Sequence, residues 1–133
     1  PFAIQKDLQE MMQDLVGIVR NEEEMIRALE GIEKLKERSE NVSVTGNIDF
    51  NPGWHTSLDL HNLLNVSEGI TLAAIERKES RGGQFREDYP QKISEFGKIN
   101  FVINKEDDGR MNIKSVPIPE MPDDLKQIIE ELG

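Results

Sequence analysis

The sequence predicts a mainly α fold, in which three helices form a bundle and a β-hairpin and a short C-terminal helix are appended to it. Three observations predict this fold. Apolar residues recur at helical spacing in three long segments, whereas the residues from about 98 to 116 alternate between apolar and polar side chains. A proline-rich stretch then separates this alternating region from a last short helical segment. At 133 residues, the chain has the length of one domain with its own core.

The first two helices follow from apolar stripes and a capping residue. The first stripe lies on one side of a helix and consists of Ile4, Leu8, Met11, Met12, Leu15 and Val19. Asn21 is a good N-cap for a second helix, because three glutamates follow it where negative charge suits the helix dipole. The buried edge of this helix would contain Met25, Leu29, Ile32 and Leu35. The connection at Arg20 and Asn21 is short. The first helix could therefore continue into the second with a bend, or the chain could fold back on itself, and the sequence leaves both alternatives open.

The third helix should be central to the bundle, an arrangement like that of a spectrin repeat. It is expected to begin near Trp54 and to stop at Gly82-Gly83, after a connection over residues 41–53. No Lys or Arg occurs between Asn41 and Ile75, which favours burial on more than one side. Gly69 predicts a close approach of another helix. The apolar side would contain Leu60, Leu63, Leu64, Ile70, Ala74 and Ile75.

The C-terminal part should form a hairpin from about Lys98 to Val116, with Asp108-Gly109 as its turn signal. Prolines end the second strand, and Asp123 would cap the last helix. We therefore divide the chain into residues 1–90, the bundle with the closing turn ESRGGQFREDYP, and residues 91–133, the hairpin and short helix. An isolated hairpin is marginally stable, so the second unit must pack on the bundle or on a domain outside this chain.

Composition and motifs exclude several kinds of site. The net charge of −10 argues against a nucleic-acid partner, and the absence of cysteine excludes thiolate chemistry. No run of eighteen apolar residues predicts insertion into a membrane. His55 and His61 lack a nucleophile motif, and neither a metal-ligand spacing nor a glycine-rich nucleotide fingerprint occurs. We therefore predict no catalytic, cofactor-binding or metal-binding residues in this chain.

The segment from Glu76 to Pro90 contains three of the seven arginines of this acidic chain. One interpretation is a solvated helix end, with exposed ion pairs to neighbouring carboxylates that contribute under about 1 kcal/mol each. The other is a docking surface, because the planar guanidinium fork suits a carboxylate or a carbonyl of a partner. Both remain open from the residues alone. The candidate docking residues are Arg77, Arg81, Arg86, Asp88 and Tyr89.

The segment NPGWHTSLDLHNLL, followed by SEGITLAAIERKESRGGQFREDYP, resembles the C-terminal helical domain of the succinate dehydrogenase and fumarate reductase flavoprotein subunits, a family that includes L-aspartate oxidase. The helical opening and the closing PIPEMPDDLKQIIEEL are also similar to this family. Gln84 stands where the family usually has histidine, and glutamine keeps a donor and an acceptor but does not titrate.

The resemblance implies a parent that binds FAD and transfers hydride between the flavin and a dicarboxylate, with succinate, fumarate and aspartate all open as substrates. Electrons would pass to an iron–sulfur subunit and on to a quinone or another acceptor. The implied partners are the FAD-binding domain of the same parent chain and the iron–sulfur subunit, and the implied location is cytoplasmic, peripheral on the cytoplasmic face of the membrane. The flavin and substrate residues belong to the family's other domains.

We therefore expect this chain alone to bind no FAD and to be inactive. Because it begins with Pro1, we also expect it to be cut from a longer parent. We expect Arg81→Ala to leave the melting temperature of the chain nearly unchanged and to weaken assembly of the subunit. The alternative is a free-standing helical protein-interaction or regulatory module.

Overall fold

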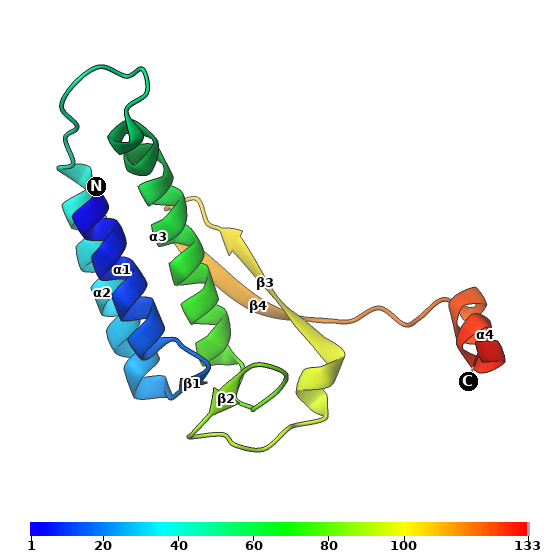
Figure 1. The fold of residues 1–133 in the computed structure, drawn as a ribbon. Coiled ribbons are helices and arrows are strands. Elements are labelled where there is room, and N and C mark those ends of the chain that lie inside the picture. The colour runs from blue at the N-terminus through cyan, green and yellow to red at the C-terminus, as the bar shows by residue number, and fades with distance from the viewer. Residues whose placement is uncertain (133) are drawn as a thin grey trace.

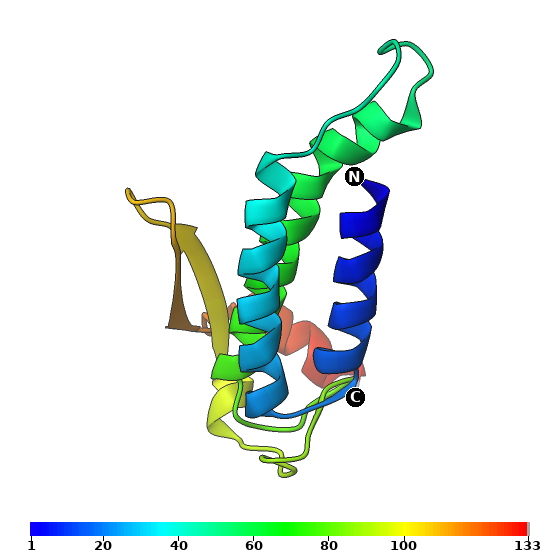
Figure 2. The same cartoon turned by 90° about the vertical axis from the view of Figure 1, so that its left-hand side faces the viewer.

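The structure, a computed structural model that describes residues 1–132, confirms the mainly α fold with a three-helix bundle, a hairpin and a short last helix (Figure 1). The bundle consists of α1 (Phe2–Leu15), α2 (Glu22–Glu40) and α3 (Pro52–Glu76). Each helix runs antiparallel to the one before it (Figure 2). The chain therefore folds back after α1 and does not continue as one bent helix.

The joint between α1 and α2 contains a short strand that the sequence did not predict. This strand, β1 (Val19–Arg20), pairs in parallel with β2 (Phe85–Arg86). Val19 was expected on the buried stripe of the first helix, but it lies in β1 with 55% of its surface exposed. The helical stripe ends at Leu15 because the chain beyond it forms hydrogen bonds with a segment that is remote in sequence.

The ends of α2 and α3 show which local signals were reliable. Asn21 caps α2 as predicted, because its side-chain oxygen accepts a backbone N–H at 3.0 Å. The N-cap of α3 is Asn51, so this helix begins at Pro52, two residues before the predicted start. The prediction that Gly82-Gly83 stops α3 was wrong, since the helix ends at Glu76.

The core lies between the three helices and is built from one apolar face of each. Ile70 was predicted in this core, but half of its surface is exposed (50%). The close approach at Gly69 comes from the hairpin and not from a helix, because a Cβ atom there would lie 3.5 Å from Ile103 Cδ1 and 3.8 Å from Met111 Sδ. The buried core residues are Ile4, Leu8, Val16, Met25, Ala28, Ile32, Leu35, Leu60, Leu64 and Ala74.

The hairpin is confirmed and packs against α3. After a 3₁₀ turn, η1 (Glu95–Lys98), strand β3 (Ile99–Lys105) pairs antiparallel with β4 (Met111–Pro117). Gly109 closes the connecting turn with φ +86°, a conformation that glycine adopts without steric cost.

The last helix, α4 (Asp123–Leu132), lies away from the bundle at the end of an extended segment (Figure 1). Asp123 is the first residue of this helix and not the preceding cap that the sequence suggested. None of its residues is buried, and its apolar side chains are about half exposed or more: Leu125 47%, Ile128 49%, Ile129 57% and Leu132 84%.

Deletion of residues 119–133 should leave the free energy of unfolding of the bundle unchanged to within about 0.5 kcal/mol, because no residue of α4 is buried and the helix lies away from the bundle (Figure 1). Urea denaturation followed by near-UV circular dichroism and tryptophan fluorescence measures this quantity through Trp54. A larger loss of stability would mean that α4 packs on the bundle in solution.

Candidate functional site

The arginine-rich segment folds back on the helix that precedes it. The side chain of Arg86 is completely buried (0% exposed). Its Nη1 atom donates to three carbonyl oxygens at the end of α3, those of Ala74 at 2.7 Å, Ile75 at 3.2 Å and Arg77 at 3.3 Å. The last carbonyls of a helix have no partner within it and form the negative end of the helix dipole. Arg86 therefore caps the C-terminus of α3.

The same guanidinium connects α3 to the start of α2. Arg86 forms a bidentate pair with Asp88, with Nε to Oδ1 and Nη2 to Oδ2 both at 2.7 Å. Asp88 Oδ2 also accepts the backbone N–H of Glu22, the first residue of α2, at 3.0 Å. Asn21, the cap of α2, donates to Glu87 Oε2 at 3.2 Å. The end of one helix and the beginning of another are thus held together by the turn.

Strand pairing reinforces this connection. The N–H of Phe85 donates to the carbonyl of Ile18 at 2.9 Å, and that of Glu87 donates to the carbonyl of Arg20 at 3.0 Å. Tyr89 lies beside the same cluster, with Arg86 Cζ 5.1 Å from its ring centroid. The turn is therefore part of the bundle's own structure at the end where β1 and β2 lie (Figure 1).

A second cluster surrounds Glu79, whose side chain is also completely buried (0% exposed). Glu79 Oε1 accepts Arg81 Nε at 2.6 Å and Arg77 Nη1 at 2.8 Å. Glu79 Oε2 accepts Arg81 Nη2 at 3.1 Å and the backbone N–H of Ile93 at 2.8 Å. This carboxylate therefore joins the end of α3 to the segment that leads into the hairpin.

Arg81 completes that cluster from the outside. Its Nη2 atom also donates to the carbonyl of Ile93 at 2.8 Å, and its guanidinium lies so close to Gly97 that a Cβ there would be 3.1 Å from Nη2. Both carboxylate oxygens of buried Glu79 accept hydrogen bonds from Arg81. We therefore expect Arg81→Ala to destabilise the chain itself. This revises the sequence-based expectation of an unchanged melting temperature.

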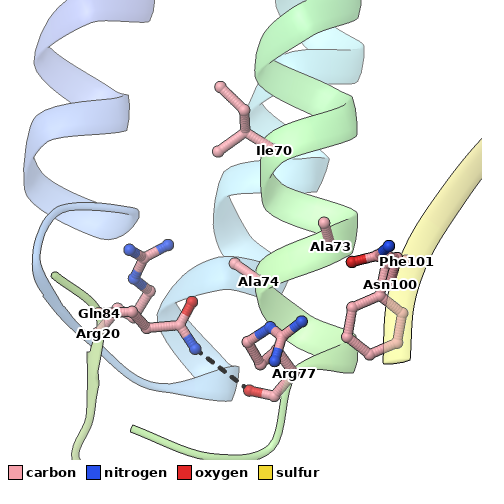
Figure 3. A pocket seen from close by; sticks show the side chains of 8 residues that line it. All are labelled: Arg20, Ile70, Ala73, Ala74, Arg77, Gln84, Asn100 and Phe101. Atoms are coloured by element: carbon pink, nitrogen blue, oxygen red, sulfur yellow. Dashed lines mark hydrogen bonds between the residues drawn. The ribbon is translucent and has the colours of Figure 1, made fainter. Parts of the chain in front are cut away.

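Gly82-Gly83 forms a tight turn between Arg81 and Gln84, which are bridged to each other, and Gly82 has φ +61°. Positive φ at the first central residue is typical of a type II′ turn, which explains a glycine there. Gln84 donates its side-chain amide to the carbonyl of Arg77 at 3.3 Å (Figure 3) and to that of Glu79 at 3.0 Å. The side chain of Gln84 thus acts as a donor to backbone carbonyls.

The structure brings all five candidate docking residues into these two adjoining clusters. Arg86 is buried, whereas the side chains of Arg77, Arg81 and Asp88 keep 22%, 29% and 28% of their surface exposed. Sequence reasoning missed Glu79, which it treated as one of several acids balancing a helix end. The signal was present: outside a helix, residues two apart point to the same side, and arginines stand two positions before and after Glu79.

The arginines keep both central carboxylates ionised. Hydrogen bonds from Arg81 are the main cause that lowers the pKa of Glu79 from 4.5 to about 2, although burial acts in the opposite direction. Hydrogen bonds from Arg86 are likewise the main cause that lowers the pKa of Asp88 from 3.8 to about 2.

These pKa values predict that the chain loses stability in acid. A carboxyl group with a lowered pKa in the folded state stabilises that state above its unfolded pKa, so the contribution is complete above roughly pH 5 and is lost as the pH falls toward about 2. Urea denaturation at a series of pH values measures the effect. The free energy of unfolding should fall less steeply with falling pH in Glu79→Gln than in the unsubstituted chain. An equal pH dependence in both would contradict the prediction.

Elsewhere, the described residues contain no group of three or more His, Asp or Glu side chains that could hold a metal ion. His55 and His61 both lie exposed on α3. In the part of the chain that the structure describes, no helix is both long and apolar enough to cross a bilayer.

The fold and the turn together define a class of protein: a helical domain whose charged residues tie its own helix ends together. The family described as fumarate reductase flavoprotein C-term matches residues 5–128, and the chain belongs to this family. The resemblance to the succinate dehydrogenase and fumarate reductase flavoprotein subunits, with L-aspartate oxidase among them, is thereby confirmed.

Individual relatives agree with this assignment. An uncharacterized FAD-dependent oxidoreductase of Methanocaldococcus jannaschii is 38% identical over 77% of the chain and 18% of its own length. A fumarate reductase flavoprotein subunit of Mycobacterium tuberculosis is 28% identical over 86% of the chain and 20% of its own length. Among solved structures, the Sdh1 complex of Mycobacterium smegmatis has a subunit with a TM-score of 0.81 and 40% identity, covering 92% of this chain and 22% of that one. The chain thus spans about a fifth of the length of its relatives.

Proposed function

We propose that this chain is the structural and docking domain at the C-terminal end of a flavoprotein subunit of the succinate dehydrogenase and fumarate reductase type. The observation that supports this most is the family match over residues 5–128, in a chain that spans only about a fifth of its relatives. The parent subunit would bind FAD, transfer hydride between the flavin and a dicarboxylate, and pass electrons to an iron–sulfur subunit. The chain itself would contribute shape and contacts and no reacting group.

Uncovered apolar side chains support a docking role. They lie in and beside the arginine-rich segment from Glu76 to Pro90, which we call the arginine turn. Ile18, Val19 and Phe85 are 72%, 55% and 44% exposed, and strand pairing holds them together. A group of exposed apolar side chains on a folded surface commonly marks an interface. We propose that the FAD-binding domain of the same parent covers this surface and the apolar face of α4.

The five arginine-turn residues would then act in different ways. Arg86, which is buried, would support docking by holding the turn in place, as would its partner Asp88. Arg77, Arg81 and Tyr89, which are partly exposed, would contact the neighbouring domain or the iron–sulfur subunit. The assembled subunit would lie on the cytoplasmic face of the membrane, attached through other subunits of the complex.

Reconstitution from two polypeptides tests this proposal. The part of the parent that precedes this chain and the chain itself are produced separately, mixed, and analysed by size-exclusion chromatography and isothermal titration calorimetry. We expect a one-to-one complex, with flavin absorbance in the preceding part and with succinate-dependent dye reduction by the complex. Phe85→Asp should weaken the association, whereas Leu58→Asp, an equally apolar exposed position on α3, should not.

Two results would count against the proposal. Flavin binding or turnover by the chain alone would assign it chemistry of its own. Failure of the two folded polypeptides to associate would favour a free-standing helical interaction module.

A further inference from the structure

A cavity of about 470 Å³ opens beside the arginine turn, and residues of β1, α3, the turn and β3 line it. Arg20 and Gln84 line it on one side of α3, and Asn100 and Phe101 of β3 line it on the other (Figure 3). Ile70 and the small side chain of Ala73 lie between them. The cavity thus combines an apolar lining with a few polar groups.

Arg20 differs from the other arginines of this region because its charge is not matched. Arg77, Arg81 and Arg86 each pair with a buried or partly buried carboxylate of this chain. Arg20 Nε is shielded from solvent, yet it has no hydrogen-bond partner among the described residues. Burial is the main cause that lowers the pKa of Arg20, and the like charge of Arg86 lowers it further.

A shielded Nε–H group without an acceptor costs free energy, because its desolvation is not offset by a hydrogen bond. A partner that supplies the missing acceptor removes this cost. Here the partner must satisfy two conditions: it must present an acceptor that fits the planar guanidinium fork, and it must cover the apolar lining of the cavity. The apolar part of this lining includes Ile70, which is 50% exposed, and the half-buried Ala73 and Phe101.

We propose that Arg20 is the anchor of a carboxylate-binding site, and that its occupant is an Asp or Glu side chain from the part of the parent chain that precedes these residues. This inference rests on the proposed function. Two observations favour a side chain over a free carboxylate ion. The net charge of −10 repels dissolved anions, and the apolar lining of the cavity favours an apolar surface that a small ion lacks. A side chain on a docked domain is delivered at high effective concentration.

The direction in which Arg20→Met changes the melting temperature tests the inference. In this chain alone, Arg20→Met should leave the melting temperature unchanged or raise it, because the substitution removes a half-buried charge whose shielded Nε–H has no acceptor among the described residues. In the intact parent chain, the same substitution should lower the melting temperature, because the carboxylate of the other domain loses its partner. In the two-polypeptide mixture it should weaken association roughly tenfold or more. Arg20→Lys should weaken it less.

Arg27, which is exposed on α2, provides the matched control, and Arg27→Met should change none of these quantities. If Arg20→Met lowers the melting temperature by a similar amount in the chain alone and in the parent, Arg20 is an internal structural residue and the inference is overturned. If it lowers the melting temperature of neither, the inference is overturned as well. Absence of any association of the unsubstituted polypeptides would instead reject the proposed function.

A separate experiment distinguishes a free carboxylate ion from a carboxylate side chain of the parent. Acetate and succinate are titrated into the chain while the Nε–H resonance of Arg20 is followed by NMR. We expect no saturable shift. A saturable shift that Arg20→Met abolishes would identify a site for a free carboxylate ion and overturn the assignment to a side chain of the parent.

Discussion

Replacing Arg86 by methionine is expected to lower the free energy of unfolding of the chain by about 3–5 kcal/mol, the cost of removing one partner of a buried ion pair. Three carbonyls at the end of α3 lose their donor, and Asp88 keeps its contact with α2 but loses its cation. One substitution therefore uncaps the end of α3 and removes the cation that pairs with Asp88 at the start of α2. Methionine is chosen because its length fills much of the same space without a charge.

Urea denaturation of the isolated chain measures this loss. Arg86→Lys should recover only a small part of it, because an ammonium group cannot form the bidentate pair and reach the helix carbonyls at once. The control is Arg38→Met, which removes an exposed pair with Asp7 and should cost under about 1 kcal/mol. Equal losses in Arg86→Met and Arg38→Met would show that the cap of α3 does not stabilise the bundle.

Replacing Glu79 by alanine is expected to have an effect of similar size, about 3–5 kcal/mol, for a different reason. The substitution leaves two arginines facing each other without the carboxylate between them, and it removes the acceptor of the Ile93 N–H. The link between the end of α3 and the approach to the hairpin is lost.

Glu76→Ala provides the comparison, because Glu76 is an exposed acid three residues earlier in the sequence. We expect its effect to be within about 0.5 kcal/mol. Combining Glu79→Ala with Arg81→Ala should cost clearly less than the sum of the single substitutions, because both remove the same pair. Strict additivity would contradict the paired cluster.

The candidate site could be predicted in part. The density of arginines in an acidic chain identified the right segment, and all five candidate residues lie in or beside the two clusters. Their hydrogen-bond partners could not be predicted, because Arg86 bonds to Ala74, twelve residues away, and Asp88 bonds to the start of α2, sixty-six residues away. Such pairings depend on how the helices are placed.

The sequence by itself determined the three bundle helices, the hairpin, the Asn21 cap and the family resemblance. These features depend on local spacing, on a capping residue or on a motif, all of which can be read within about one helix length. Only the tertiary structure decided where the third helix ends, that Val19 leaves the first stripe for a strand, and that Glu79 and Arg86 are buried. Those outcomes depend on backbone groups and charges remote in sequence, which find their partners only when the helices pack together.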